Sequence, residues 1–240
     1  MPFTYEYPRP AVCVDCVVFG IPAPARSISR RRVPRLDVLL IRRLRDPFAG
    51  RYALPGGFVE IDEPLEPAAR RELLEETGIA PARLVPLGMY GDPGRDPRGR
   101  TISAVFHAVV WTEEHAPTAG DDAEAARWFP LQRLPALAFD HDAIVREAWQ
   151  ALRRGVRGGP FGLELLPGDF DAETLAWVYR AVLGRGLELN QLLAGLLRYS
   201  LLRRATGRGR KDAEPGRYRW NVASYRKWER LGFDGLGLQS

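Results

Sequence analysis

Residues 57–79 read GFVEIDEPLEPAARRELLEETGI, a stretch that crowds acidic side chains beside a glycine-rich turn. From Leu65 onward it contains no β-branched run and is rich in Leu, Ala, Glu and Arg, which are strong helix formers. Pro64 suits the start of a helix, and Gly78 is the residue type most often found just beyond a helix C-terminus. The stretch therefore predicts a helix over residues 65–77.

Three acids crowd one face of this predicted helix. Glu72 lies three and four residues before Glu75 and Glu76, and like charges at these spacings destabilise a helix by about 0.2–0.5 kcal/mol per pair. A solvated charged face is the ordinary explanation for such a run. Here, however, the acids do not alternate with Lys or Arg, and they follow the turn LPGG at 54–57. Clustered carboxylates and backbone carbonyls bind hard divalent cations, so the pattern predicts a cation site.

The spacing within this stretch resembles the complete signature of the Nudix hydrolases. Gly57 is followed by five residues and Glu63, and then by seven residues and RELLEETGI at 71–79. The resemblance implies an α/β fold, the Nudix mixed-sheet α/β/α sandwich. It also implies cleavage of a nucleoside diphosphate linked to another group, with Mg²⁺ or Mn²⁺. The metal ligands that it implies are Gly57 (through its carbonyl), Glu72, Glu75 and Glu76, with Glu63 and Arg71 supporting the site through ion pairs.

The general base of such a reaction is left open between two places in the sequence. A positioned base contributes about 10²–10⁴-fold to the rate. Glu72 or Glu76 could take this role within the helix, whereas in many Nudix hydrolases an acid on a distant loop does so. In the segment GDDAEAARWF the candidates are Asp121, Asp122 and Glu124, for which an ordinary polar loop is the alternative. We take Glu72, Glu76 and Asp122 as the catalytic candidates.

Composition and the positions of the cysteines limit which classes of protein the chain can belong to. The 240 residues are comfortable for two domains, and 45% hydrophobic content supports buried cores. No run approaches 18 apolar residues and the first ten residues lack signal-peptide character, so we expect a cytoplasmic protein without a membrane partner. Cys13 and Cys16 lie in a strand-like run, AVCVDCVVFG, where their spacing points them to opposite faces. We therefore expect buried thiols rather than a disulfide.

The first part of the chain reads as strands around the predicted helix. Apolar, β-rich runs predict strands at 12–19, 37–42, 51–59, 84–91, 101–111 and 126–130. A second amphipathic helix is predicted at 142–154, and Asp140 with His141 fits its cap better than a catalytic histidine. The stretch GVRGGP at 155–160 then predicts a linker or boundary between a Nudix domain at 1–154 and a second domain at 155–240. The net charge of +5 lies wholly in the second domain.

Two further stretches resemble one branch of the family. GDPGRDPRGRTISAVF at 91–106 and LAFDHDAI at 137–144 are similar to segments of the ADP-ribose pyrophosphatases, and equally to the Nudix-related transcriptional regulators of NAD metabolism. The predicted substrate is therefore ADP-ribose or a related NAD metabolite. Arg95, Arg98 and Arg100 are candidate substrate ligands because guanidinium groups suit phosphate oxygens. A solubilising loop with local Asp–Arg pairs is the alternative.

The C-terminal part has the order of a small winged helix-turn-helix-like domain. A helix is predicted at 171–183 and one or two shorter helices between residues 188 and 199, followed by hairpin strands at 200–206 and 217–221. This order resembles the C-terminal domain of the regulators, so the resemblance extends over the whole chain and implies a homodimer. The candidate contacts to nucleic-acid phosphates are Arg203, Arg204, Arg208, Arg210 and Lys211.

One departure weighs against sequence-specific DNA binding. The helix that would enter the major groove reads NQLLAGLLRYSLL, in which Arg198 is the single basic residue among Leu and Ala. A recognition helix must present polar side chains to base edges. This helix is better suited to packing against a domain or a second subunit.

The sequence favours one function and keeps two others open. The complete acidic set favours a divalent-metal-dependent pyrophosphohydrolase over a domain that only senses a ligand. The alternative is a transcriptional regulator of NAD metabolism, whose Nudix domain senses an ADP-ribose-like effector and whose C-terminal domain binds DNA. A third function, hydrolysis of mRNA caps or other RNA ends, is supported only by the net positive charge of the C-terminal part.

Overall fold

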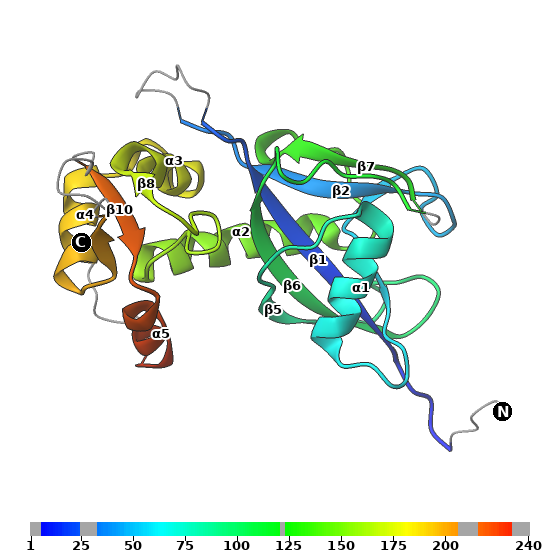
Figure 1. Ribbon diagram of the computed structural model, residues 1–240. Coiled ribbons are helices and arrows are strands. Elements are labelled where there is room, and N and C mark those ends of the chain that lie inside the picture. The colour runs from blue at the N-terminus through cyan, green and yellow to red at the C-terminus, as the bar shows by residue number, and fades with distance from the viewer. Residues whose placement is uncertain (1–5, 25–32, 121–122, 206–215, 232–240) are drawn as a thin grey trace. The chain divides into compact units, whose positions relative to one another are not determined.

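The computed structural model describes residues 6–24, 33–120, 123–205 and 216–231 (Figure 1). The chain divides into two compact units, one of Met1–Gly20 and Asp37–Ala148, the other of Ile21–Leu36 and Trp149–Ser240. The domain ranges 1–154 and 155–240 stay predictions. No helix in the part of the chain that the structure describes has the length and apolar character of a membrane span.

A seven-stranded sheet forms the centre of the first unit. Its order is β3-β2-β1-β6-β5, with β4 paired to β1 and β7 paired to β2. The strands are β1 Ala11–Ile21, β2 Asp37–Arg43, β3 Tyr52–Ala53, β4 Gly56–Phe58, β5 Val85–Tyr90, β6 Thr101–Trp111 and β7 Ala123–Pro130, with a short 3-10 helix at Leu131–Arg133. The strand predicted at 51–59 is split in two, because Pro55 has no N–H and Gly56 adopts a φ of 156°.

Helix α1 (Leu65–Thr77) has the predicted bounds and ends at Gly78, which adopts the left-handed conformation with φ 70°. Its inner face carries Ala68, Ala69 and Leu73, each 0% exposed. These side chains share a core cluster with alternate residues of two strands, namely Val14, Cys16 and Val18 of β1 and Ala104, Phe106, Ala108 and Val110 of β6. Since successive strand residues point to opposite faces, one set of side chains meets the helix and fixes its position (Figure 1).

Helix α2 (His141–Gly158) is longer than predicted. The prediction of a linker from residue 155 is therefore wrong for 155–158, which continue the helix. A buried side chain recurs every four residues, and none of the four is more than 4% exposed: Ile144, Ala148, Leu152 and Val156. Burial of Val156 offsets the cost of the two glycines, which is about 0.5–1 kcal/mol each inside a helix.

Besides the end of α2, the second unit contains three helices and a small sheet among its described residues. The helices are α3 Ala172–Leu183, α4 Leu189–Arg198 and α5 Val222–Leu231, with a 3-10 helix at Gly184–Gly186. The strands are β8 Phe170–Asp171, β9 Leu202–Arg204 and β10 Arg217–Trp220, in the order β8-β10-β9. Asp171 caps α3 by accepting the Thr174 N–H at 2.7 Å. The predicted helix at 171–183 and the hairpin are confirmed, and the segment 188–199 forms a single helix, α4. Neither β8 nor α5 was predicted.

Candidate active site

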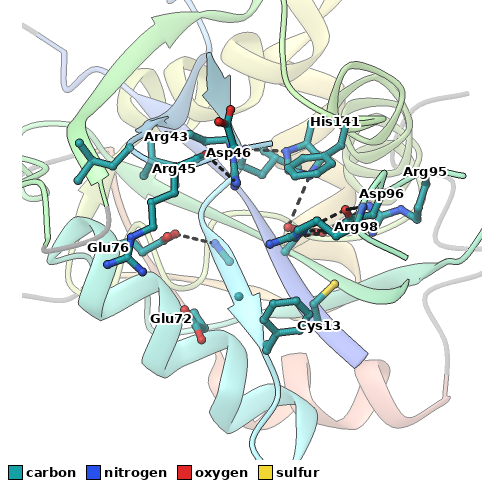
Figure 2. A pocket seen from close by; sticks show the side chains of 18 of the residues that line it. Cys13, Arg43, Arg45, Asp46, Glu72, Glu76, Arg95, Asp96, Arg98 and His141 are labelled. Carbon is teal, nitrogen blue, oxygen red and sulfur yellow. Dashed lines mark hydrogen bonds and ion pairs between the residues drawn. The ribbon is translucent and has the colours of Figure 1, made fainter. Parts of the chain in front are cut away.

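A cavity of about 500 Å³ lies in the first unit, lined by β1, β4, α1, the segments 43–46 and 95–98, and the start of α2. Figure 2 shows Glu72 and Glu76 projecting from α1 on one side, with Asp96, Arg98 and His141 across from them. The cavity therefore joins the acidic face of the signature helix to basic and aromatic side chains that are distant in sequence.

The turn before β4 packs directly onto the carboxylates of α1. A Cβ added to Gly57 would lie 2.4 Å from the Glu72 carboxylate, so only glycine lets the backbone approach this closely. The neighbouring Gly56 N–H donates to Glu76 Oε2 at 2.8 Å. A Cβ at Gly56 would lie 2.1 Å from the Val14 carbonyl oxygen. The two glycines therefore bring the turn, β1 and both acids together.

Arg71 binds three acids around the mouth of the site. Its guanidinium forms two hydrogen bonds to Glu63 and also donates to Glu72 Oε1 at 2.8 Å and to Glu75 Oε2 at 3.2 Å. It further donates to the Phe58 carbonyl at 3.2 Å, which ties the end of β4 to the helix. Part of the repulsion along α1 is thus relieved by a single cation.

The two cavity acids differ from ordinary surface carboxylates. Burial raises the pKa of Glu76 to about 8, and the charges of Glu72 and Asp15 add to this effect, while the Gly56 N–H opposes it. Burial also raises the pKa of Glu72, against the lowering effect of Arg71. A nearby positive charge would stabilise the ionised form of both carboxylates, which burial disfavours.

The donor set on this face suits a hard divalent cation. Glu72 and Glu76 supply carboxylate oxygens, and the Gly57 backbone lies against Glu72. Oxygen ligands of this kind are those that Mg²⁺ and Mn²⁺ prefer. Within the described ranges, no three His, Cys, Asp or Glu side chains gather as a metal-holding group, and the Glu75 carboxylate is 59% exposed and turned to Arg71. Two carboxylates and a carbonyl fit a site whose remaining ligands are water and substrate phosphate.

Cations and aromatic rings line the other part of the cavity. Arg43, Arg45 and Arg98 contribute guanidinium groups, and Phe58 and Phe139 contribute rings. The Arg98 guanidinium carbon lies 5.2 Å from the Phe58 ring centre and 5.7 Å from that of Phe139, while Arg43 lies 4.9 Å from Phe139. Phe139 has a left-handed φ of 55°, a strained conformation for an aromatic residue that is typical of functional sites.

A buried polar network forms the inner wall of the cavity. Arg95 donates two hydrogen bonds to Asp140, at 2.7 and 2.9 Å, and its guanidinium lies 3.6 Å from Asp15. His141 is 3% exposed, and its Nδ1 accepts the Leu54 N–H at 2.9 Å. Burial lowers the pKa of His141 despite the nearby Asp15 and Asp140. Asp140 directly precedes α2, and its backbone carbonyl accepts the Ala143 N–H at 2.9 Å, while both of its carboxylate oxygens accept from Arg95. The predicted cap role of its side chain stays a prediction.

Of the other predicted site residues, some line the cavity and others lie away from it. Arg95 and Arg98 line the cavity, whereas Arg100 is exposed and donates to the Gly91 carbonyl. Glu124 pairs with Arg42 at 2.8 Å and does not line the cavity, while Asp121 and Asp122 lie outside the described residues. Of the cysteines, both are free, but Cys13 is only partly buried and lines the cavity.

Several cavity residues were missed by sequence reasoning. Those with polar, charged or aromatic side chains are Asp15, Arg43, Arg45, Asp46, Phe58, Glu60, Asp96 and Phe139. The basic cluster at the end of β2 and the aromatic residue within LAFDHDAI were the signals available, but neither pattern indicates a shared cavity by itself.

The sequence profile of the NUDIX domain matches residues 23–150, more than half of the chain. The chain belongs to the Nudix family. Nudix hydrolases generally use divalent metal ions, in agreement with the oxygen donors that α1 and the preceding turn bring together.

Relatives from both predicted branches of the Nudix family match the chain. An ADP-ribose pyrophosphatase of Methanocaldococcus jannaschii is 51% identical over 110 residues, covering 46% of this chain and 64%, less than two thirds, of that protein. The ADPR responsive transcriptional repressor NtrR of Acinetobacter baylyi is 30% identical over 187 residues, covering 76% of this chain and 70% of that one. The structure of Shewanella oneidensis NrtR complexed with a 27mer DNA is similar over 90% of this chain and 95% of that one, with 25% identity and a TM-score of 0.67. The predicted resemblance to the Nudix regulators, with a Nudix fold followed by a winged helix, is confirmed.

Proposed function

We propose that the chain is a divalent-metal-dependent pyrophosphohydrolase that cleaves ADP-ribose or a related NAD metabolite. The observation that carries the proposal is the cavity, in which Glu72 and Glu76 face the same space as Arg43 and Arg98. A pyrophosphate is polyanionic, so it fits between guanidinium groups and a cation held by carboxylates. The names of the pyrophosphatase and the ADPR responsive repressor support the choice of ADP-ribose.

Different residues of the chain have different roles in the proposed reaction. A Mg²⁺ or Mn²⁺ ion held by Glu72, Glu76 and the Gly57 carbonyl would screen the phosphate charges and lower the pKa of bound water. Glu75 stays a predicted fourth ligand, which would have to exchange Arg71 for the ion. The Gly56 N–H orients Glu76, and Arg71, which itself lines the cavity, orients Glu72.

The remaining roles in this proposal concern the substrate and the base. Arg43 and Arg98 are placed to bind phosphate or ribose oxygens, whereas Arg95 is 5% exposed and holds Asp140 and Asp15. Glu72, Glu76 and Asp122 stay the candidates for the general base. The choice of Mg²⁺ over Mn²⁺ and a homodimeric assembly are further parts of the proposal, which cation titration and sedimentation would test.

Mg²⁺-dependent formation of AMP from ADP-ribose tests the proposal. Glu76→Gln removes a metal ligand with little change in shape. Glu66→Gln is the matched control, because Glu66 lies on the same helix, pairs with Arg70 at 2.9 Å and does not line the cavity. AMP from the native protein and from Glu66→Gln, but not from Glu76→Gln, is the expected result. No product from the native protein, across a panel of nucleoside diphosphate derivatives, would overturn it.

A second function, binding of DNA by the winged-helix unit, rests on the basic hairpin. Arg203 of β9 lies directly opposite Arg219 of β10, and both are exposed. Like charges in this position destabilise a hairpin, so phosphate groups would stabilise it. Arg219 is partly neutralised by Asp169 at 2.6 Å. The solved complex of NrtR with a 27mer DNA supports this alternative, while the single basic residue of α4 weighs against sequence-specific readout.

Salt-dependent DNA binding tests this second function. Each lost phosphate contact lowers the slope of log K against log salt by about 0.9. We expect Arg203→Gln and Arg204→Gln each to lower the slope by about this amount if the hairpin holds a duplex. An unchanged slope would exclude these two side chains as phosphate contacts. Arg208, Arg210 and Lys211 lie outside the described residues.

A further inference from the structure

The Leu54–Gly57 turn is anchored by a residue far away in the chain. Leu54 is 2% exposed, and its N–H lies between β3 and β4, where it donates to His141 Nδ1 at 2.9 Å. A buried backbone N–H requires a partner, so this hydrogen bond fixes where the turn begins. The Cys16 N–H donates to the Pro55 carbonyl at 2.9 Å and holds the next residue against β1.

The orientation of the His141 ring is itself determined by its surroundings. Because Nδ1 accepts a hydrogen bond, the neutral ring carries its proton on Nε2, which lies 3.7 Å from Asp15 Oδ1. Asp15 is held in turn by the Ser103 hydroxyl and lies near Arg95, which binds Asp140 beside the histidine. The ring therefore has little freedom to rotate away from Leu54.

The anchored turn carries the groups that meet the carboxylates of α1. Two residues after Leu54, the Gly56 N–H donates to Glu76 Oε2 at 2.8 Å. Gly57, one residue further, lies so close to Glu72 that a Cβ would clash with its carboxylate. A shift of the turn would therefore displace the Gly57 carbonyl and both acids relative to one another.

We infer that His141 is a positioning residue for the cation site, acting through the hydrogen bond from Leu54 to its Nδ1. It sets the register of the turn against Glu72 and Glu76, and it neither binds the cation nor transfers a proton. The inference rests on the proposed metal-dependent function and adds a residue from the start of α2 to the site.

Two substitutions at one position separate this role from general packing. In His141→Asn the side-chain oxygen occupies the place of Nδ1 and can accept the Leu54 N–H, whereas His141→Leu has similar bulk and no acceptor. His107→Leu is the matched control, because His107 is a partly buried histidine of β6 that does not line the cavity. The Kd for Mn²⁺ would be measured on the full chain without substrate, by the electron paramagnetic resonance signal of free Mn²⁺. Steady-state kinetics on ADP-ribose and thermal unfolding would accompany it.

We expect His141→Leu to weaken Mn²⁺ binding and lower kcat by about 10–100-fold, as changes to residues behind metal ligands generally do. KM for ADP-ribose is expected to change much less. His141→Asn should restore most of both losses, and His107→Leu should bind Mn²⁺ like the native protein. Native Mn²⁺ affinity and kcat in a folded His141→Leu variant would overturn the inference, and so would equal losses in folded Asn and Leu variants. A native protein that binds Mn²⁺ but forms no AMP would instead refute the proposed reaction. The Mn²⁺ affinities of the variants would then decide whether His141 positions the cation site.

Discussion

The substitution Gly57→Ala tests the closeness of the turn to the signature helix. A Cβ at residue 57 would lie 2.4–2.5 Å from three atoms of the Glu72 carboxylate, whereas ordinary contact begins at 3.4 Å. Glu72 must therefore retreat by about 1 Å, a displacement that can cost on the order of 10²-fold in rate when a reacting group depends on it. This loss corresponds to about 2.7 kcal/mol of transition-state stabilisation.

The same substitution has little reason to unfold the protein. The clashing atoms belong to the end of a flexible side chain, and replacing glycine with alanine reduces the entropy of the unfolded chain by about 0.4–1 kcal/mol where the backbone permits it. We therefore expect the free energy of unfolding to change by less than about 1 kcal/mol, while kcat for AMP formation falls about 100-fold.

The assay is Mg²⁺-dependent AMP formation together with denaturant unfolding of each variant. Gly88→Ala in β5 is the control, since the nearest atom to its added Cβ would be Tyr90 Cε2 at 3.7 Å. If Gly57→Ala keeps kcat within about threefold of native, the close approach of the turn to Glu72 does not govern the reaction and the reasoning fails.

Three further changes probe the rest of the chain. Burial lowers the pKa of His107 to about 4, so its charging favours the unfolded state. Stability should then fall by up to about 3 kcal/mol as pH drops from about 6.5 to 4, and His107→Leu should flatten that part of the curve of unfolding free energy against pH. Gly155→Ala should raise the free energy of unfolding by about 0.5–1 kcal/mol, because Gly155 lies within α2 with nothing within 4 Å of the added Cβ; a neutral or destabilising result would contradict the helical assignment there. Burial raises the pKa of Cys13 to about 11, so iodoacetamide should alkylate it about 100-fold more slowly at pH 8 than a free thiol, with Cys13→Ser assigning the signal; labelling at the free rate would refute this.

The local features of the active site could be read from the sequence. Helix propensity, the spacing of the acids and the position of Gly78 are properties of neighbouring residues, and α1 has the predicted bounds. Glu72 and Glu76 share one helix face for the same reason, so their meeting in one cavity was foreseeable. The extension of α2 was not, because its glycines resemble a linker until the burial of Val156 is known.

Only the tertiary structure decided which side chains complete the cavity. Leu54 and His141 are separated by 87 positions, and Arg95 and Asp140 by 45, so no periodicity or local propensity could pair them. Arg95 was predicted as a substrate ligand, yet burial and two carboxylates hold it in the wall of the cavity. Glu75 is a glutamate on the same helix as Glu72 and Glu76, but its side chain points to Arg71 and does not line the cavity. The sequence by itself therefore determined a helix that presents acids beside a glycine turn, since both depend on nearby residues, whereas the partners of that turn depend on how distant strands and loops pack.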